Sequence, residues 1–301
     1  MICVFGSINV DVGVATPRLP LPGETVLGGQ AMLSPGGKGA NQAHAARCFG
    51  AEVKMFGATG DDAFAATALG AMPAAGVDLS GVVVVAGRAT GMALIMVDAK
   101  GENSIVVAAG ANLAAVAEQV PDQVLRASDC LLLQLETEMG ATMALARRAK
   151  QLGCQVILNA SPLDPEHPPD LDAVDILIVN AHELQQLAGE GAAPAELALA
   201  LSARHGCEVL VTLGAQGSLL VDPGGAMLNV AALDVAVRDT TGAGDTFAGV
   251  FAAAISEGAD RRRAMRYAAA AAAIACTRPG AQAAQPPRSE IEQLMTSKDT
   301  A

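Results

Sequence analysis

A glycine-containing segment that ends in an aspartate is the first candidate for chemistry. Residues 239–245 read DTTGAGD and lead directly into an apolar stretch that predicts a helix over 242–256. Gly242 and Gly244 let backbone N–H groups turn toward a ligand, and the helix dipole adds positive charge at the same point. This pattern predicts an anion hole. Asp245 beside it could take the proton of an attacking hydroxyl, or it could merely complement the helix dipole.

A second glycine-rich segment, PGGKGAN at residues 35–41, opens another predicted helix. Its lysine, Lys38, suggests phosphate binding, but no Ser or Thr follows it and the spacing is not that of a P-loop. Close approach of the backbone to a polyhydroxylated ligand accounts better for the glycines. The alternative is a glycine-rich turn with a solvated lysine.

Two pairs of polar residues add candidate ligand contacts. Asn9 and Asp11 stand two apart after the first predicted strand, where both could hydrogen-bond vicinal hydroxyls; a turn or N-cap role is the alternative. Asn180 and Glu183 stand three apart where a helix is predicted to begin. They could lie near Mg²⁺ or its waters, or they could be a plain helix cap and an exposed carboxylate.

The elements that must position these residues alternate regularly along the chain. Short apolar runs at 2–5, 53–56, 131–133, 156–158, 176–179 and 209–212 each precede a helical pattern. The helical patterns cover 40–49, 63–75, 138–151, 181–188, 194–205, 242–256 and 261–277. This alternation predicts an α/β fold with a parallel sheet. Polar residues follow strand after strand, which predicts a binding site at the carboxyl edge of the sheet.

Two stretches break this alternation and have antiparallel patterns, at about 11–34 and 90–109. We expect them to form one small sheet inserted into a single α/β domain that spans residues 1–301. A chain of this length has enough apolar content to bury a large core, since 51% of its residues are hydrophobic.

Composition excludes several classes of partner. A net charge of −12 argues against a nucleic-acid ligand, which needs a basic face. No apolar run reaches the roughly 18 residues of a membrane-spanning helix. Six cysteines without a C-x-x-C pair are typical of a reducing cytosol, so we expect a cytoplasmic protein. Aromatic residues make up only 2% of the chain, which disfavours an aromatic clamp for a nucleoside base.

The ordered set of motifs resembles the ribokinase-like (PfkB) carbohydrate kinase family over almost the whole chain. The motifs are GSINVD at 6–11, PGETV at 22–26, GGKGANQA at 36–43, TGDD at 59–62, GAN at 110–112, QLE at 134–136, TLGAQG at 212–217, DTTGAGDTF at 239–247 and TRPGAQ at 277–282. The resemblance implies a central, mostly parallel sheet flanked by helices, with the small antiparallel sheet as a lid over the sugar and as the contact of a homodimer. It implies ATP-dependent phosphorylation of a sugar, with D-ribose as the first candidate for the substrate and O5 as the atom that accepts the phosphoryl group.

The resemblance also implies roles for individual residues. Asp245 would be the base, and Gly242, Ala243 and Gly244 would form the anion hole. The sugar would be held by Asn9, Asp11, Gly37, Lys38, Gly39, Asn41 and Glu136. The nucleotide would be held by Asn180, Thr212, Gly214, Gly217 and Gly244, with Glu183 near Mg²⁺. A monovalent cation, usually K⁺, would lie beside the hole, held by Asp239 and by carbonyls around Thr241, Ala275, Arg278 and Gly280.

Departures from the family pattern bear on nucleotide affinity and cation dependence more than on the reaction type. Ala269 stands near the expected adenine position, where a larger polar side chain occurs in the family, and Ala284 stands where a Ser can help to hold the cation. Two other functions stay open. One is a related kinase acting on another sugar or a nucleoside, and the other is a sugar- or nucleotide-binding protein without turnover.

Overall fold

The computed structural model describes residues 1–299, and a sheet of nine strands forms its centre. The spatial order is β13 (Met227–Val230), β12 (Ser218–Val221), β11 (Glu208–Thr212), β10 (Ile176–Asn180), β9 (Gln155–Asn159), β8 (Cys130–Leu133), β1 (Ile2–Phe5), β4 (Val53–Gly60) and β5 (Asp78–Val85). Every neighbouring pair from β11 to β5 is parallel, whereas β12 and β13 are antiparallel. The predicted mostly parallel sheet is therefore confirmed.

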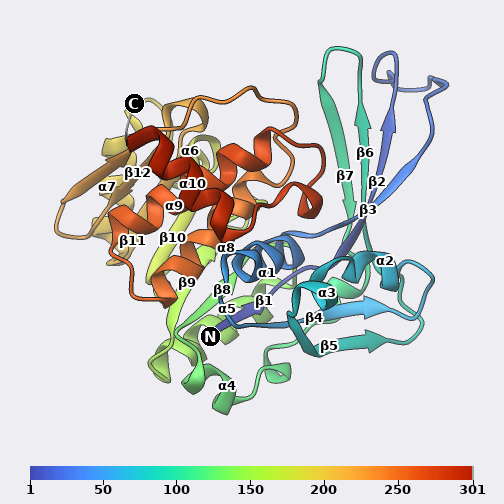
Figure 1. The fold of residues 1–301 in the computed structure, drawn as a ribbon. Helices are drawn as coiled ribbons and strands as arrows, with labels where there is room; N and C mark the ends of the chain where they lie inside the picture. The colour runs from blue at the N-terminus through green and yellow to red at the C-terminus, as the bar shows by residue number, and fades with distance from the viewer. Residues whose placement is uncertain (300–301) are drawn as a thin grey trace.

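Helices cover both faces of this sheet (Figure 1). Alternation along β1 shows the two layers, because Ile2 and Val4 pack into one apolar cluster while Cys3 and Phe5 pack into the other. The first cluster contains α1 (Lys38–Phe49), α2 (Ala65–Leu69), α3 (Met72–Ala75), α8 (Ala243–Ser256), α9 (Arg261–Cys276) and a residue of α10 (Arg288–Asp299). The second contains α4 (Asp122–Ala127), α5 (Met139–Gln151), α6 (Ala181–Ala188) and α7 (Pro194–His205).

Short 3₁₀ turns complete the helical elements at η1 (Gly110–Ala114), η2 (Ala117–Gln119), η3 (Gly214–Gln216) and η4 (Gln282–Ala284). The helix predicted over 63–75 is wrong as a single element, because α2 and α3 are separate. They part at Gly70, which has φ +51° and lies so close to Pro35 that a side chain would overlap it. Within residues 1–299 no helix is long and apolar enough to cross a membrane.

A separate sheet of four strands rises beside the body (Figure 1). Its order is β3 (Met32–Gly36), β2 (Asn9–Ala15), β6 (Gly91–Val97) and β7 (Asn103–Ala108). Each of the two predicted stretches is antiparallel within itself, as expected, but β2 and β6 join them as a parallel pair. The reason is directional: β2 follows β1 and β6 follows β5, and both leave the carboxyl edge of one parallel sheet.

Candidate active site

Asp245 lies in the first turn of α8 and is only 7% exposed. Both of its carboxylate oxygens accept hydrogen bonds from amide side chains of α1. Asn41 Nδ2 donates to Oδ2 at 3.0 Å, and Gln42 Nε2 donates to Oδ1 at 3.0 Å. Two separate donors fix the plane of the carboxylate, so the group is held in one orientation before any ligand arrives.

Gly249 explains why α1 and α8 lie close enough for these bonds. It follows Asp245 by four residues and so lies on the same side of α8, one turn further along. A Cβ built at Gly249 would overlap the backbone carbonyl oxygen of Gln42 and lie 2.9 Å from the Cβ of Ala45. The missing side chain therefore lets the two helix backbones meet at the level of the carboxylate.

The N-terminus of α8 has the form expected of an anion hole. Gly242 is the N-cap residue with φ +71°, and a Cβ there would press on Ala281 at 2.9 Å. A Cβ at Gly244 would meet nothing within 4 Å, so this side of the turn is open. Thr246 makes the first bond to Gly242, and the N–H groups of Gly244 and Asp245 therefore have no acceptor within the helix.

Glu136 and Lys38 lie on the other side of the carboxylate. Glu136 Oε2 accepts hydrogen bonds from Ser7 Oγ at 2.6 Å and from the backbone N–H of Lys38 at 3.1 Å. Burial lowers the pKa of the Lys38 ammonium, but surrounding carboxylates outweigh that effect and raise the pKa above its ordinary value. The carboxylates are those of Asp245, Glu136, Glu183 and Asp11.

Asp11 lies over Gly36, where a Cβ would overlap its carboxylate group. Burial raises the pKa of Asp11 to about 6, the negative charges of Glu136 and Asp245 add to the rise, and Lys38 opposes it. The structure thus gathers carboxylates from β2, from the end of β8 and from α8 around one ammonium group. Such a set can accept hydrogen bonds from several hydroxyls of one ligand.

Asn9 and two of the glycines have their close contacts within the protein. Asn9 is buried, and its Oδ1 accepts a hydrogen bond from Asn112 Nδ2 at 2.7 Å. Side chains at Gly37 and Gly39 would overlap the backbone at residues 6–9, where the chain leaves β1. The predicted close backbone approach is therefore present, and it brings the start of α1 against the end of β1.

Asn180 and Glu183 form a reciprocal capping box at the start of α6. Asn180 Oδ1 accepts a hydrogen bond from the backbone N–H of Glu183 at 2.9 Å, and Glu183 Oε2 accepts one from the backbone N–H of Asn180 at 2.8 Å. The cap alternative is thus realised, but the exposed carboxylate is wrong because Glu183 is buried. Its charge acts on Lys38, which links the cap to the group around Asp245.

The loop after β11 turns sharply at two glycines. Thr212 ends the strand, and η3 follows it between Gly214, with φ +57°, and Gly217, with φ +97°. A side chain at Gly217 would overlap the carbonyl oxygen of Val230 at the end of β13. The glycines therefore hold this loop against the β13 end of the sheet.

The segment before α8 is tied to the segment after α9. Asp239 Oδ1 accepts a hydrogen bond from the N–H of Thr241 at 2.9 Å, and its Oδ2 accepts one from the N–H of Gly280 at 2.8 Å. The N–H of Arg278 donates to the carbonyl of Ala275 at 3.0 Å. The residues predicted around a monovalent cation thus lie in the segment before α8, in the last turn of α9 and in the segment after it, and Asp239 joins these segments.

Sequence reasoning assigned no role to the buried amides behind Asp245. Gln42 stands inside the motif GGKGANQA. Gln134 opens the motif QLE, and Asn159 is one of the polar residues that follow the predicted strands. All three are buried and joined by hydrogen bonds in the structure. The available signal was Gln42 itself, a glutamine directly after Asn41 at the start of a helix in which alanines recur.

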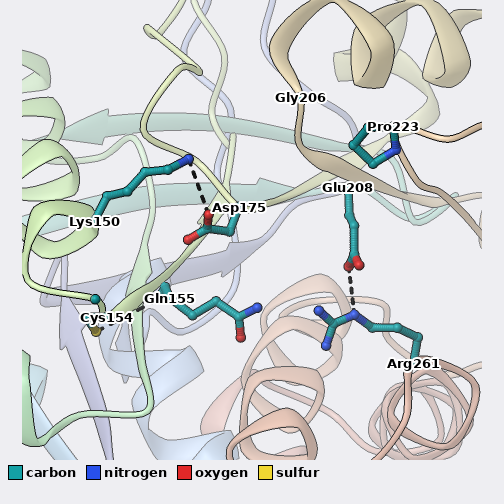
Figure 2. A pocket seen from close by; sticks show the side chains of 9 residues that line it. Lys150, Cys154, Gln155, Asp175, Gly206, Glu208, Pro223 and Arg261 are labelled. Atoms are coloured by element: carbon teal, nitrogen blue, oxygen red, sulfur yellow. Dashed lines mark hydrogen bonds and ion pairs between the residues drawn. The ribbon is translucent and has the colours of Figure 1, made fainter.

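A pocket of about 500 Å³ lies at the opposite, amino-terminal edge of the sheet (Figure 2). Its charged side chains form two ion pairs, Lys150 with Asp175 at 3.3 Å and Arg261 with Glu208 at 2.7 Å. The charges of this pocket are therefore balanced internally. None of the residues that line it is among the predicted site residues.

Among residues 1–299, no group of three or more His, Cys, Asp or Glu side chains has the arrangement of a metal cluster. A divalent ion at this site would therefore need ligands from outside such a cluster, and substrate phosphates are the usual source for Mg²⁺.

Comparisons with known proteins agree with this geometry. The family model described as pfkB family carbohydrate kinase matches residues 1–288. A ribokinase of Haemophilus influenzae is 38% identical over 298 residues, which cover 97% of each chain. A ribokinase of Bacillus subtilis is 36% identical over 298 residues, covering 98% of this chain and 99% of the relative.

Solved structures show the same fold. The ribokinase of Arabidopsis thaliana, solved with ribose and ATP, superposes with a TM-score of 0.87 at 33% identity, covering 98% of both chains. The ribokinase of Thermotoga maritima superposes with a TM-score of 0.88 at 33% identity, covering 98% of this chain and 99% of the other. The family match and these full-length similarities show that the chain belongs to the pfkB family of carbohydrate kinases.

Proposed function

We propose that this chain transfers the γ-phosphoryl group of ATP to O5 of D-ribose and so forms D-ribose 5-phosphate. The observation that carries the proposal is the buried Asp245 carboxylate, held by two amide donors beside the open N-terminus of α8. The similar Arabidopsis structure is a complex with ribose and ATP, and ribokinase is the name of the relatives that match over almost the full chain.

The reaction needs one proton acceptor and a place for the transferring charge. Asp245 takes the proton of the O5 hydroxyl while O5 forms its bond to the γ-phosphorus and the bond to the bridging oxygen of ADP breaks. Gly242, Ala243 and Gly244 would form the anion hole: the N–H of Ala243 donates to the carbonyl of Thr240 and closes the turn, and the N–H of Gly244, with the dipole of α8, stabilises the negative charge on the phosphoryl oxygens. The Lys38 ammonium, whose charge interacts with that of Asp245, adds positive charge to the site.

The sugar site is assigned to the polar set between β2, the start of α1 and the end of β8. Asp11 and Glu136 would accept hydrogen bonds from ribose hydroxyls, and Asn41 and Lys38 would donate them. Asn9, Gly37 and Gly39 would contribute through the backbone geometry that places this set.

The nucleotide site is assigned to the neighbouring strand ends, at Asn180, Thr212, Gly214, Gly217 and Gly244. Mg²⁺ bound with ATP neutralises charge on its phosphates, and Glu183 is the buried carboxylate proposed to hold waters of that ion. K⁺ fits the carboxylate of Asp239 and the carbonyls near Thr241, Ala275, Arg278 and Gly280, because a large monovalent cation accepts such oxygen ligands.

The small sheet is proposed as the lid over the sugar and as the contact of a homodimer. Leu33, Leu94 and Val106 are 52%, 47% and 60% exposed, and they occupy one cross-strand row with Val12. An apolar row this exposed is typical of an interface. Its other face carries Asp11 toward the predicted sugar site, since successive residues of a strand point to opposite faces.

Release of ADP from purified protein with ATP and Mg²⁺ tests the function. The acceptors are D-ribose, 2-deoxyribose, fructose, adenosine and fructose 6-phosphate, and Asp245→Asn is the control. We expect ribose-dependent turnover that falls at least about 1,000-fold in the variant, because the base is lost while the size of the side chain is kept. Turnover with only another acceptor would change the substrate, and sugar binding without any product would favour a binding protein.

Potassium dependence is tested on the same reaction. We expect K⁺ to raise turnover over a buffer with only a bulky organic cation, and Asp239→Asn to reduce this stimulation. Equal turnover with and without K⁺ in the native protein would remove the cation from the proposal. The departure at Ala284 makes this measurement informative, since a hydroxyl ligand is missing there.

A further inference from the structure

We propose that Gln42 is a positioning residue that holds the Asp245 carboxylate in its reactive orientation from the buried side. Its side chain is fully buried on α1 and has no access to ligand or solvent. Its role therefore differs from that of its neighbour Asn41, which is assigned to the sugar site. The inference rests on the proposed function only in taking Asp245 as the base.

The hydrogen bonds of Gln42 are fully used. Its Nε2 has two protons, and it donates to Asp245 Oδ1 at 3.0 Å and to Asn159 Oδ1 at 2.9 Å. Its Oε1 accepts a hydrogen bond from Gln134 Nε2 at 2.7 Å. Every polar atom of this amide thus has a partner, so rotation away from the carboxylate would break buried hydrogen bonds.

The direction of this chain of amides is set by the carboxylate. An ionised carboxylate only accepts, so Gln42 must present its N–H₂ group to Asp245 and its carbonyl to Gln134. If the Gln42 amide were flipped, its carbonyl oxygen would face two acceptors, Asp245 Oδ1 and Asn159 Oδ1. Its N–H₂ group would face a donor, Gln134 Nε2. Asn159 continues the order by donating from Nδ2 to the carbonyl of Ile178 at 3.2 Å.

The chain also connects the elements that define the edge of the sheet. Gln134 follows β8, Asn159 ends β9, Gln42 lies on α1 and Asp245 lies on α8. Hydrogen bonds therefore fix the position of the carboxylate relative to two central strands and to a second helix, and not only relative to its own helix. A displacement of about 1 Å at a reacting group costs on the order of 100-fold in rate, which is why such support matters.

The test is the separate effect of Gln42→Met on kcat and on KM. Methionine has nearly the same shape but cannot donate a hydrogen bond, so the carboxylate gains freedom while the sugar-binding atoms stay in place. We expect kcat to fall about 10- to 100-fold, with KM for ribose and for ATP within about threefold of native. Gln119→Met is the matched structural control, because its amide bridges the N–H of Val116 and the carbonyl of Gly57 away from the site.

A second variant keeps the test decisive if Gln42→Met folds poorly. Gln42→Glu keeps the length of the side chain but sets a second carboxyl group against Asp245, and two close carboxyl groups must share a proton. The charged groups coupled to Asp245, namely Lys38 and Asp11, are the same in variant and native protein. At the low end of the pH range the introduced carboxyl group keeps the shared proton and donates it in a hydrogen bond to Asp245, as the Gln42 amide does. As pH rises this proton is lost and two negative charges face each other, so we expect the ratio of variant to native kcat to fall between pH 6 and 9.

Three results would overturn the positioning role. They are a kcat of Gln42→Met within twofold of native, a loss of kcat equal to that of Gln119→Met, or a pH-independent ratio for Gln42→Glu. Failure of the proposed function is distinguishable, because the native protein would then lack ribose-dependent ADP release or would keep it in Asp245→Asn.

Discussion

The interface of α1 and α8 buries polar side chains, whereas the small sheet exposes apolar ones. At the interface, Asn41, Gln42 and Asp245 are almost completely removed from solvent, and each has hydrogen-bond partners within the protein. Buried polar groups that are fully paired are rigid, because any movement breaks bonds that water does not replace.

The small sheet has the opposite arrangement. Leu33, Leu94 and Val106 lie in a row on its outer face, and each is about half exposed. The base of the sheet joins the core of the body through Val10 and Met92, and the rest of the sheet rises beside the body (Figure 1). Its apolar groups need a further surface to be buried.

The two regions are therefore prepared for reaction in different ways. The body holds the Asp245 carboxylate in place without a ligand, so binding energy is not needed to orient the proposed base. In the proposed function the small sheet instead depends on what it contacts, a sugar on one face and a second chain on the other. Substitutions in the body should therefore act on kcat, and substitutions in the small sheet should act on KM or on assembly.

Among the substitutions that test this difference between the two regions, Gly249→Ala should have the largest effect, since it acts on the body. The added Cβ overlaps the backbone of Gln42 and cannot be relieved by a side-chain rotation. We expect kcat to fall about 100-fold and the free energy of unfolding to fall by about 1–3 kcal/mol, as in other overpacked sites. Steady-state kinetics and thermal melting check both values. Gly29→Ala in the small-sheet loop is the control, because its Cβ meets nothing closer than 3.5 Å.

Asp11→Asn should act mainly on sugar binding, with KM for ribose raised about 10-fold and kcat changed less. The pKa of Asp11 is raised to about 6, so the folded protein holds its proton more tightly than the unfolded chain. This residue therefore stabilises the fold at pH 4 relative to pH 7, and that benefit is lost as pH rises through 6. The neutral variant should melt about 2–4 °C higher at pH 7.

The pH dependence of native binding provides the complementary measurement for Asp11. A carboxylate accepts hydrogen bonds from two hydroxyls, whereas the protonated form accepts fewer. KM for ribose should therefore rise in the native protein as pH falls below 6, and this rise should be absent in Asp11→Asn. A native KM that is constant between pH 5 and 8 would contradict the assignment of Asp11 to the sugar.

Leu94→Lys should have the smallest effect on the chemistry. It puts a charge in the apolar row of the small sheet, so we expect the sedimentation coefficient to change from a dimer to a monomer while kcat stays within about threefold. Val84→Lys on β5 is the matched control, because Val84 is also an exposed aliphatic residue of a β-strand but lies on the body. A native protein that sediments as a monomer would contradict the dimer.

Local signals in the sequence were sufficient for much of the fold. The helices over 181–188 and 194–205 begin and end at the predicted residues, because Asn180 caps one start and Pro194 and Gly206 bound the other. The apolar runs became the central strands, since burial on both faces requires them to be continuously apolar. The group around Asp245 was also predicted, because its members are polar residues at helix starts and strand ends.

Other elements were not predicted because their signals are not local. β5 is only partly buried at the edge of the sheet, and the β12–β13 hairpin pairs antiparallel after a parallel sheet. The break at Gly70 depends on Pro35, which comes from a distant strand. None of these features follows from the periodicity of the segment itself.

The amino-acid sequence alone was enough to identify the residues that are proposed for phosphoryl transfer and the strand or helix end that carries each one. Residue type and spacing are enough for that, because capping, periodicity and glycine conformations act over a few residues. Only the tertiary structure decided that Gln42 meets Asp245, 203 residues away, and Asn159, 117 residues away. Such contacts depend on how closely whole helices and strands pack, and a missing side chain at Gly249 sets that distance.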